Sequence, residues 1–228
     1  MAVYLIPSLL AVDAVETIPP YVLEAIKDCQ VFFVENERTT RRFFKQIWKE
    51  MVIDNYEWYT MGEETDSQFI QKIKEGKNIG IISEAGCPGV ADPGQKLTAI
   101  AQQMNVVIKP LVGPSSILLA LMASGMNGQS FQFVGYLPID NAERTKTIKV
   151  LEVESKKKNC TQIFIETPYR NNQLIETLIK TCHPHTKLCI AVDITGKEEW
   201  IKTKTISEWQ KQLPNIHKKT AIFLVYAG

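Results

Sequence analysis

The sequence predicts an α/β fold that is divided into two domains. Short apolar runs, each long enough for one buried strand, alternate with stretches of helical spacing along the chain. This alternation is typical of a sheet of mostly parallel strands covered by helices. The segment PLVGP, which begins at Pro110, breaks the pattern close to the midpoint. We therefore expect an N-terminal α/β domain over residues 1–111 and a C-terminal α/β domain over residues 112–228.

In the first half, short apolar runs predict strands over residues 3–6, 31–34, 79–83 and 106–108. Apolar residues recur at helical spacing over residues 19–26, 39–49, 66–76 and 97–104. Pro19 and Pro20 suit the opening turn of the first of these helices. Asp66 is predicted to cap the third helix at its N-terminus, and Gly76 is predicted to end it.

In the second half, strands are predicted over residues 131–134, 162–165, 188–192 and 221–226, and helices over residues 143–155 and 171–181. A further helix is expected over residues 117–123, ended by Gly125. Because that segment is apolar on all sides, we expect the helix to be fully buried.

Composition excludes several classes of protein. Apolar residues make up 45% of the 228 residues, which is unlike a disordered chain. The net charge is only +1, so any nucleic-acid or membrane partner must use a local basic patch. No apolar run is long enough for a membrane span, and the opening MAVYLIPSLLAV is interpreted as a strand and loop.

The five cysteines form no CxxC pair, which favours reduced thiols and a cytoplasmic protein. A cluster of cysteine and histidine near residue 185 has no common zinc spacing, and Pro184 interrupts it. A polar turn beside a core cysteine explains this cluster better, so no metal is expected. The members of the cluster are Cys182, His183, His185 and Cys189.

The strongest motif is the loop SEAGCPGVADPG, which runs from Ser83 to Gly94 after a predicted strand. Its glycines permit positive φ angles and close approach of a ligand, and its prolines stiffen the turn. Ligands of open α/β sheets bind beyond the carboxyl ends of the strands. A ligand-binding loop is therefore favoured over a plain surface turn. Neither GxGxxG after the first strand nor GxxxxGK[ST] occurs, which excludes the two common nucleotide-binding loops.

Two further motifs carry polar groups at the ends of predicted elements. In VGPSS, Ser115 or Ser116 suits the cap of the following helix, whose free N–H groups would equally bind a carboxylate. In FIETPYR, Glu166 and Arg170 follow a strand. A surface turn with a capping threonine fits that segment equally well on spacing alone.

Together these motifs resemble the tetrapyrrole methylase superfamily, and within it the branch of ribosomal RNA small subunit methyltransferase I. SEAGCPGVADPG resembles the branch's S-D-A-G-T-P-x-x-S-D-P-G, and VGPSS resembles its P-G-P-S-A. FQFVGYLP resembles F-x-F-x-G-F-L-P, FIETPYR resembles F-Y-E-S-P-H-R, and VENERTT resembles A-E-D-T-R-x-T. The motifs follow the family's order from about residue 3 to residue 200.

The resemblance implies a methyltransferase that holds S-adenosylmethionine between two α/β domains and forms a homodimer. It implies 2'-O-methylation of a ribose in small-subunit ribosomal RNA, so ribosomal RNA or the small ribosomal subunit is the expected partner. The cofactor-binding positions that it implies are Leu9, Ser83, Ala85, Gly86, Cys87, Pro88, Val90, Asp92, Ser115, Ser116, Glu166 and Thr195.

A ribose hydroxyl is a weak nucleophile that would gain from a carboxylate base. Glu35 and Glu166 follow predicted strands and are the candidates for that base. Arg38 and Arg170 would hold phosphate or carboxylate groups by paired hydrogen bonds. The basic face that follows Glu35 is either a solvated helix face or a phosphate-binding surface. Its residues are Arg38, Arg41, Arg42, Lys45 and Lys49.

Two alternatives stay open because the sequence departs from the branch pattern. The first loop, PSLLAVD, has no glycine where the branch reads P-T-P-I-G-N. Asn36, Glu84 and Cys87 replace an aspartate, an aspartate and a threonine. One alternative is a methyltransferase for a tetrapyrrole or another small molecule. The other is a protein that binds the cofactor and serves as an interaction module without methyl transfer.

Overall fold

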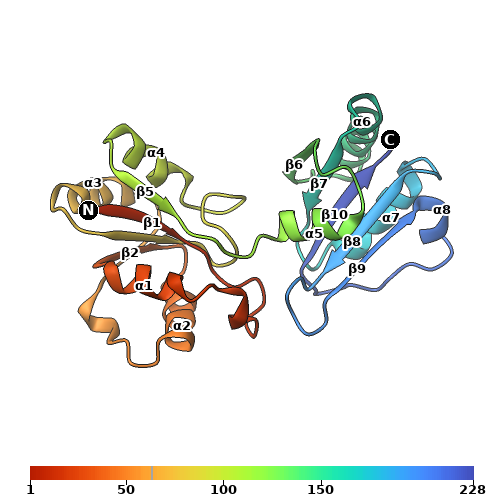
Figure 1. Ribbon diagram of the computed structural model, residues 1–228. Helices are drawn as coiled ribbons and strands as arrows, with labels where there is room; N and C mark the ends of the chain where they lie inside the picture. Colours follow the sequence, from red (N-terminus) through yellow and green to blue (C-terminus); the bar gives the residue numbers. More distant parts are fainter. Residues whose placement is uncertain (63) are drawn as a thin grey trace. The chain divides into compact units, whose positions relative to one another are not determined.

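The computed structural model describes residues 1–62 and 64–228 and confirms the α/β class. The chain forms two compact units, Met1–Ser115 and Ser116–Gly228. Each unit is built around its own five-stranded sheet (Figure 1). Residues 112–115, which follow the break expected near Val112, belong to the first unit.

The first unit contains a sheet of parallel strands in the order β3-β2-β4-β1-β5. The strands are β1 (Ala2–Ile6), β2 (Val31–Val34), β3 (Glu57–Thr60), β4 (Ile79–Ile82) and β5 (Val107–Pro110). The helices are α1 (Tyr21–Asp28), α2 (Glu37–Ile47), α3 (Thr65–Lys74) and α4 (Gln95–Gln103), with 3-10 turns η1 (Val15–Thr17) and η2 (Ile53–Asn55).

Helices cover both faces of this sheet, α1 and α2 on one face and α3 and α4 on the other (Figure 1). The strand sequences explain the two layers, because successive side chains point to opposite faces. In β2, Phe32 packs with α1 and α2, whereas Phe33 packs with Phe69 of α3. Every residue of β2 and β4 is therefore buried, as expected of central strands in a doubly covered parallel sheet.

The second unit contains a mixed sheet in the order β6-β7-β10-β8-β9. Strands β6 and β7 pair in parallel, and the other three pairs of neighbouring strands are antiparallel. The strands are β6 (Phe131–Tyr136), β7 (Thr161–Ile165), β8 (Lys187–Val192), β9 (Trp200–Thr205) and β10 (Ala221–Tyr226). The helices are α5 (Ser116–Ser124), α6 (Asn141–Lys158), α7 (Asn171–Thr181) and α8 (Ile206–Trp209). Side chains of α6, α7 and α8 form one core with the sheet.

Several predictions about single elements were wrong. Strands β3 and β9 and helix α8 were not predicted; both strands lie at sheet edges and carry polar residues among the apolar ones. Asp66 lies inside the first turn of α3 and pairs with Lys96 instead of capping the helix. Helix α5 is not fully buried, because Leu118 and Met122 lie on the face turned away from β9 and β10 and are exposed.

Three further observations concern the described part of the chain. All five cysteines are free thiols. No three side chains of histidine, cysteine, aspartate or glutamate gather as metal ligands in that part. Among its helices, none combines the length and the apolar character that a bilayer crossing requires.

Candidate functional site

Four loops meet at the carboxyl edge of the first sheet. Because its strands are parallel, the loops after β1, β2, β4 and β5 leave the same edge. These loops begin at Pro7, Glu35, Ser83 and Leu111. The edge therefore gathers most of the predicted cofactor-binding positions of this unit, which fits the general place of ligands in open α/β sheets.

The loop after β4 is held in a fixed shape by its own hydrogen bonds. The Ser83 hydroxyl donates to the carbonyl oxygen of Ala85 at 3.1 Å. The Gly89 N–H donates to the Pro93 carbonyl oxygen at 3.0 Å, and the Val90 N–H donates to the Cys87 carbonyl oxygen at 3.2 Å. The two backbone bonds close overlapping segments, residues 87–90 and 89–93, and the side chain of Val90 remains exposed.

Neighbouring loops hold the same segment from both sides. The Ser8 N–H donates to the Gly86 carbonyl oxygen at 2.8 Å. The Cys87 thiol donates to the Pro114 carbonyl oxygen at 3.6 Å. Gly86 has a φ of 66°, and a Cβ there would lie 3.5 Å from the Pro114 oxygen. The loops after β1, β4 and β5 thus form one continuous backbone surface at the sheet edge.

Carboxylates gather beside this backbone surface. Glu35, directly after β2, accepts a hydrogen bond from the Glu84 N–H at 2.8 Å. The Glu84 carboxylate in turn accepts from the Thr39 hydroxyl at 3.2 Å. Burial, together with the charges of Glu35 and Glu84, raises the pKa of Asp92 to about 6. The negative charges that contribute to this shift favour a positively charged ligand at the edge.

A cavity of about 360 Å³ lies on the α3 and α4 side of Asp92. The ion pair between Lys96 and Asp66, 2.5 Å long, lies at its wall. The described residues that line it are Met61, Gly62, Thr65, Asp66, Asp92, Pro93, Gly94, Gln95, Lys96 and Leu97. Asp92 therefore faces open space as well as the loop.

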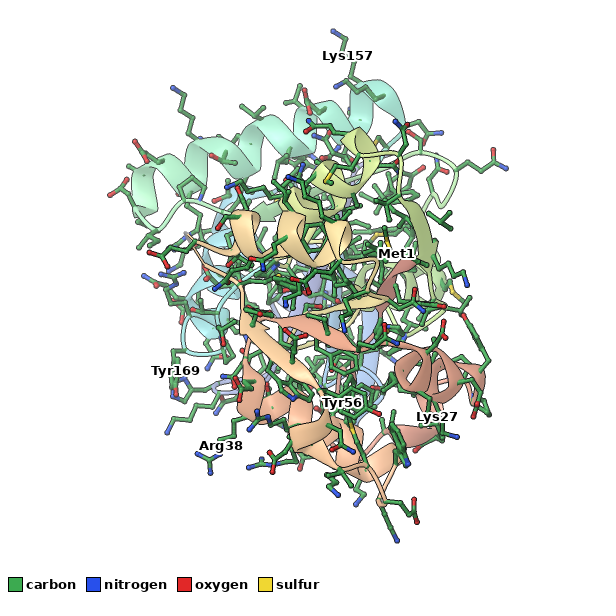
Figure 2. All side chains as sticks on the ribbon, turned by 90° about the vertical axis from the view of Figure 1, so that its left-hand side faces the viewer. Met1, Lys27, Arg38, Tyr56, Lys157 and Tyr169 are labelled. Carbon is green, nitrogen blue, oxygen red and sulfur yellow. The ribbon has the colours of Figure 1, made fainter. Side chains whose placement is uncertain are left out.

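Helix α2 places basic side chains close to Glu35 along the chain. Asn36 caps the helix by accepting hydrogen bonds from the N–H groups of Arg38 and Thr39 at 3.1 and 3.2 Å. Arg38 projects from the edge of the molecule (Figure 2). Arg41 instead pairs with Glu37 at 2.6 Å and lies over the Trp58 ring. Arg38 is thus free to contact a ligand, as are the exposed side chains of Arg42, Lys45 and Lys49, whereas Arg41 is used for packing.

The second unit has its own cluster of polar groups where β7 ends. Glu166 has a fully buried side chain, and its Oε1 accepts from Arg170 Nε at 3.0 Å, Arg170 Nη2 at 2.6 Å and the Thr167 N–H at 2.7 Å. Its Oε2 is buried and accepts no hydrogen bond from the described residues. Since buried carboxylate oxygens are normally satisfied, this oxygen has capacity for a donor on a ligand.

The loop after β8 lies at the same edge, because β7 and β8 both run antiparallel to β10. Thr195 has a φ of 70°, and its N–H donates to Glu199 Oε2 at 2.6 Å. Its hydroxyl is buried and has no partner among the described residues. Glu166 and Thr195 thus each offer an unsatisfied oxygen at one edge of the second sheet.

The structure separates the predicted site residues into two groups. In the first unit, Leu9 is buried in the core beside α1 and α2, while Glu35, the residues from Ser83 to Asp92, and Ser115 belong to the edge loops. In the second unit, Glu166, Arg170 and Thr195 share one edge, and Ser116 opens α5. Sequence reasoning overlooked Ser8, Thr39 and Pro114, because their contacts join segments that are distant in sequence.

A family model described as tetrapyrrole (corrin/porphyrin) methylases matches residues 12–210. The chain belongs to this family. A ribosomal RNA small subunit methyltransferase I from Buchnera aphidicola subsp. Schizaphis graminum is 35% identical over 162 residues, which is 70% of this chain and 55% of that protein. The protein of the same name from Vibrio cholerae is 26% identical over 208 residues, 90% of this chain and 70% of that protein. The chain thus spans roughly half to seven tenths of the curated relatives.

Solved structures of the family share the fold. The methyltransferase CobJ matches with a TM-score of 0.65 at 15% identity, covering 99% of this chain and 93% of that one. Cobalt precorrin-4 methyltransferase, CbiF, matches with a TM-score of 0.60 at 16% identity, covering 99% and 94%. At such identities the likeness concerns the fold alone.

Proposed function

We propose that the chain is an S-adenosylmethionine-dependent methyltransferase that methylates the 2'-hydroxyl of a ribose in small-subunit ribosomal RNA. The observation that carries the proposal is the loop after β4, whose sequence follows the branch pattern and whose backbone lies at the carboxyl edge of the sheet. The curated relatives named above support the choice of RNA as substrate. The proposed site of action is the cytoplasm, where ribosomal RNA is modified, and the proposed assembly is a homodimer.

The residues present suit S-adenosylmethionine in charge and in hydrogen-bonding capacity. The ligand carries a positive sulfur, and the carboxylates of Glu35, Glu84 and Asp92 create a negative potential at the edge. Its ammonium and hydroxyl groups need acceptors, and Glu166 Oε2 and Thr195 Oγ1 are buried without partners among the described residues. The proposed cofactor-binding positions of the first unit are Leu9, Ser83, Ala85, Gly86, Cys87, Pro88, Val90, Asp92 and Ser115. Those of the second unit are Ser116, Glu166 and Thr195.

When bound, S-adenosylmethionine supplies a methyl group that leaves a positively charged sulfur. The task of this chain is to position the acceptor oxygen and to take up its proton. Glu35 is the proposed base, because one of its oxygens is fixed by the Glu84 N–H and the other remains for the proton. Arg38 is proposed to contact a phosphate of the RNA. Arg170 is proposed to fix Glu166 and to contact a charged group of the ligands.

The test is transfer of labelled methyl groups to small ribosomal subunits taken from cells that lack this gene, with fractionated small molecules tested alongside. We expect label in small-subunit RNA, resistant to alkali where the 2'-hydroxyl is methylated. Gly86→Trp should abolish transfer and binding of S-adenosylmethionine, whereas Glu35→Gln should lower transfer and leave binding intact. Label found only in the small-molecule fraction would show that the substrate is a small molecule and not RNA. Binding of S-adenosylmethionine without transfer to any fraction would support a protein that binds the cofactor and serves as an interaction module.

A further inference from the structure

A groove and an exposed aromatic pair lie next to each other along the chain in the second unit. The groove, with a volume of about 410 Å³, lies between edge strand β9 and the segment after α8. It is lined by Trp200, Ile201, Lys202, Lys204, Trp209, Gln212, Leu213 and Pro214. His217 follows Pro214 by three residues, a span of at most about 11 Å. The loop that carries His217 therefore lies within about 11 Å of one wall of the groove.

The aromatic pair is formed by Tyr169 and His217. Their ring centroids are 6.0 Å apart with an interplanar angle of 70°. Tyr169 is 70% exposed, and Figure 2 shows it projecting outward from the molecule. An exposed aromatic ring of this kind does not contribute to the core, but its face is available to another flat group.

Hydrogen bonds hold the two turns that carry this pair. The Lys218 N–H donates to the Pro168 carbonyl oxygen at 3.0 Å. Asn172 donates to the Asn215 side chain at 2.8 Å and accepts from the Ile216 N–H at 2.9 Å. The pair is thus pre-organised, so little ordering free energy is lost when a ligand stacks on it.

Charges along this surface favour an anion. The Glu166 carboxylate is already paired with Arg170, and Glu198 is paired with Lys219 at 2.8 Å. Lys202 and Lys218 are exposed and make no ion pair within the described residues, and Lys204 lies over the Trp209 ring at 4.8 Å. Positive charge therefore remains on a surface that also offers aromatic faces, which is the combination that binds single-stranded nucleic acid.

We propose that the β9 groove and the Tyr169–His217 pair form a binding surface for single-stranded RNA, with a base stacked on Tyr169 and phosphates near Lys202 and Lys218. The proposal rests on the proposed function, because it assigns the RNA strand of that substrate to named residues. Stacking on an aromatic ring and contact with lysine are tolerant of sequence. The surface thus supplies affinity for the strand and leaves the choice of nucleotide to the methyl-transfer site.

The test is fluorescence anisotropy of the whole protein with a labelled single-stranded RNA of twenty nucleotides, over a series of salt concentrations. Tyr169→Ala should raise the Kd about tenfold, while Tyr169→Trp should stay within about twofold of the wild type. Phe131→Ala is the matched control, because Phe131 is also exposed in the second unit but pairs with Thr161 at the opposite end of the sheet strands, on the other edge strand, β6. It should not change the Kd.

Charge is tested separately. The double variant Lys202→Gln/Lys218→Gln should lower the slope of log K against log salt by about 1.4, since each phosphate contact with a single strand contributes about 0.7. Lys156→Gln/Lys157→Gln removes the same charge at the far end of α6 and should leave the slope unchanged. Lys157 lies at the outer end of that helix in Figure 2.

Three outcomes would overturn the proposed surface. The first is a Kd of Tyr169→Ala for RNA that equals the Kd of Phe131→Ala, and the second is an equal salt slope for the two lysine double variants. The third is tighter binding of duplex RNA that Tyr169→Ala does not weaken. Methyl transfer by the wild type separates this failure from failure of the proposed function. If the wild type transfers methyl groups to ribosomal RNA and Tyr169→Ala does not weaken RNA binding, only the proposed RNA-binding surface is refuted. If Tyr169→Ala weakens RNA binding but the wild type transfers no methyl group, only the proposed methyltransferase function is refuted.

Discussion

Replacing Gly113 by alanine tests how tightly the loops after β1 and β5 are packed. A Cβ at Gly113 would lie 2.1 Å from Pro7 Cβ and 2.4 Å from Pro7 Cγ. Carbon atoms in favourable contact are about 3.5 to 4.0 Å apart, so both contacts would be about 1 Å or more too short. The Pro7 ring has no rotamer that moves it away. The backbones of the two loops must therefore separate.

The loss of stability in Gly113→Ala follows from this rigidity. Overpacking typically lowers the free energy of unfolding by about 1 to 3 kcal/mol, and we expect the upper end because neither loop can yield. A loss of about 3 kcal/mol raises the unfolded-to-folded ratio more than a hundredfold. Since Pro114 contacts Cys87 and the Gly86 region, the same change should weaken binding of S-adenosylmethionine.

Urea unfolding followed by far-UV circular dichroism measures the loss. Gly62→Ala is the matched control in the same unit, because an added Cβ there meets no described atom within 4 Å. This control should be neutral or slightly stabilising, by up to about 1 kcal/mol, through the entropy of the unfolded chain. The reasoning is refuted if Gly113→Ala unfolds within about 0.5 kcal/mol of Gly62→Ala.

Three further predictions concern the cap, the buried ion pair and the edge carboxylate. Asn36→Ala should cost about 1 kcal/mol in urea unfolding through loss of the α2 cap, and Asn36→Asp should not; equal losses would contradict the capping role. Arg170→Met leaves the Glu166 carboxylate buried without its partner and should lower the free energy of unfolding in urea by about 3 kcal/mol at pH 7; a loss below about 0.5 kcal/mol would exclude this cause. For Asp92, a folded-state pKa of about 6 against an ordinary 3.8 gives a contribution to stability that is full below pH 4 and lost as the pH rises through 6. Thermal melts should therefore show that the stability of Asp92→Asn relative to the wild type increases between pH 4 and 7. We expect an increase of about 1 kcal/mol, because solvent screens this half-buried group. A stability difference that does not change with pH would show that the pKa of the carboxyl is not perturbed.

The central strands were predictable because burial on both faces leaves a signature in the sequence. VFFV in β2 and the run ending in Ile82 in β4 are apolar throughout, and the structure buries every residue of both. Edge strands have only one neighbour and tolerate polar residues, so EWYT and WIKTKT do not form such runs. Both strands that were missed are therefore edge strands, although two other edge strands, β5 and β6, were predicted.

The candidate site divides in a similar way. Glycine and proline reveal the loop after β4, because positive φ at Gly86 and Gly89 and a rigid turn require those residue types. No local pattern reveals that Glu35 receives a hydrogen bond from the Glu84 N–H or that Ser8 pairs with Gly86. These contacts depend on strand order, which places the ends of β2 and β1 on either side of β4.

The half-buried state of Cys87 makes the loop after β4 accessible to selective thiol chemistry. The other four cysteines are buried, and burial raises the thiol pKa of Cys182 to about 12 and also raises that of Cys189. Burial and the Asp92 charge raise the pKa of Cys87 as well, so its modification is slow at neutral pH and faster in alkaline solution. A maleimide dye applied to the native protein would thus attach within the loop after β4. Its attachment rate would then report, without any mutation, whether a molecule covers that loop.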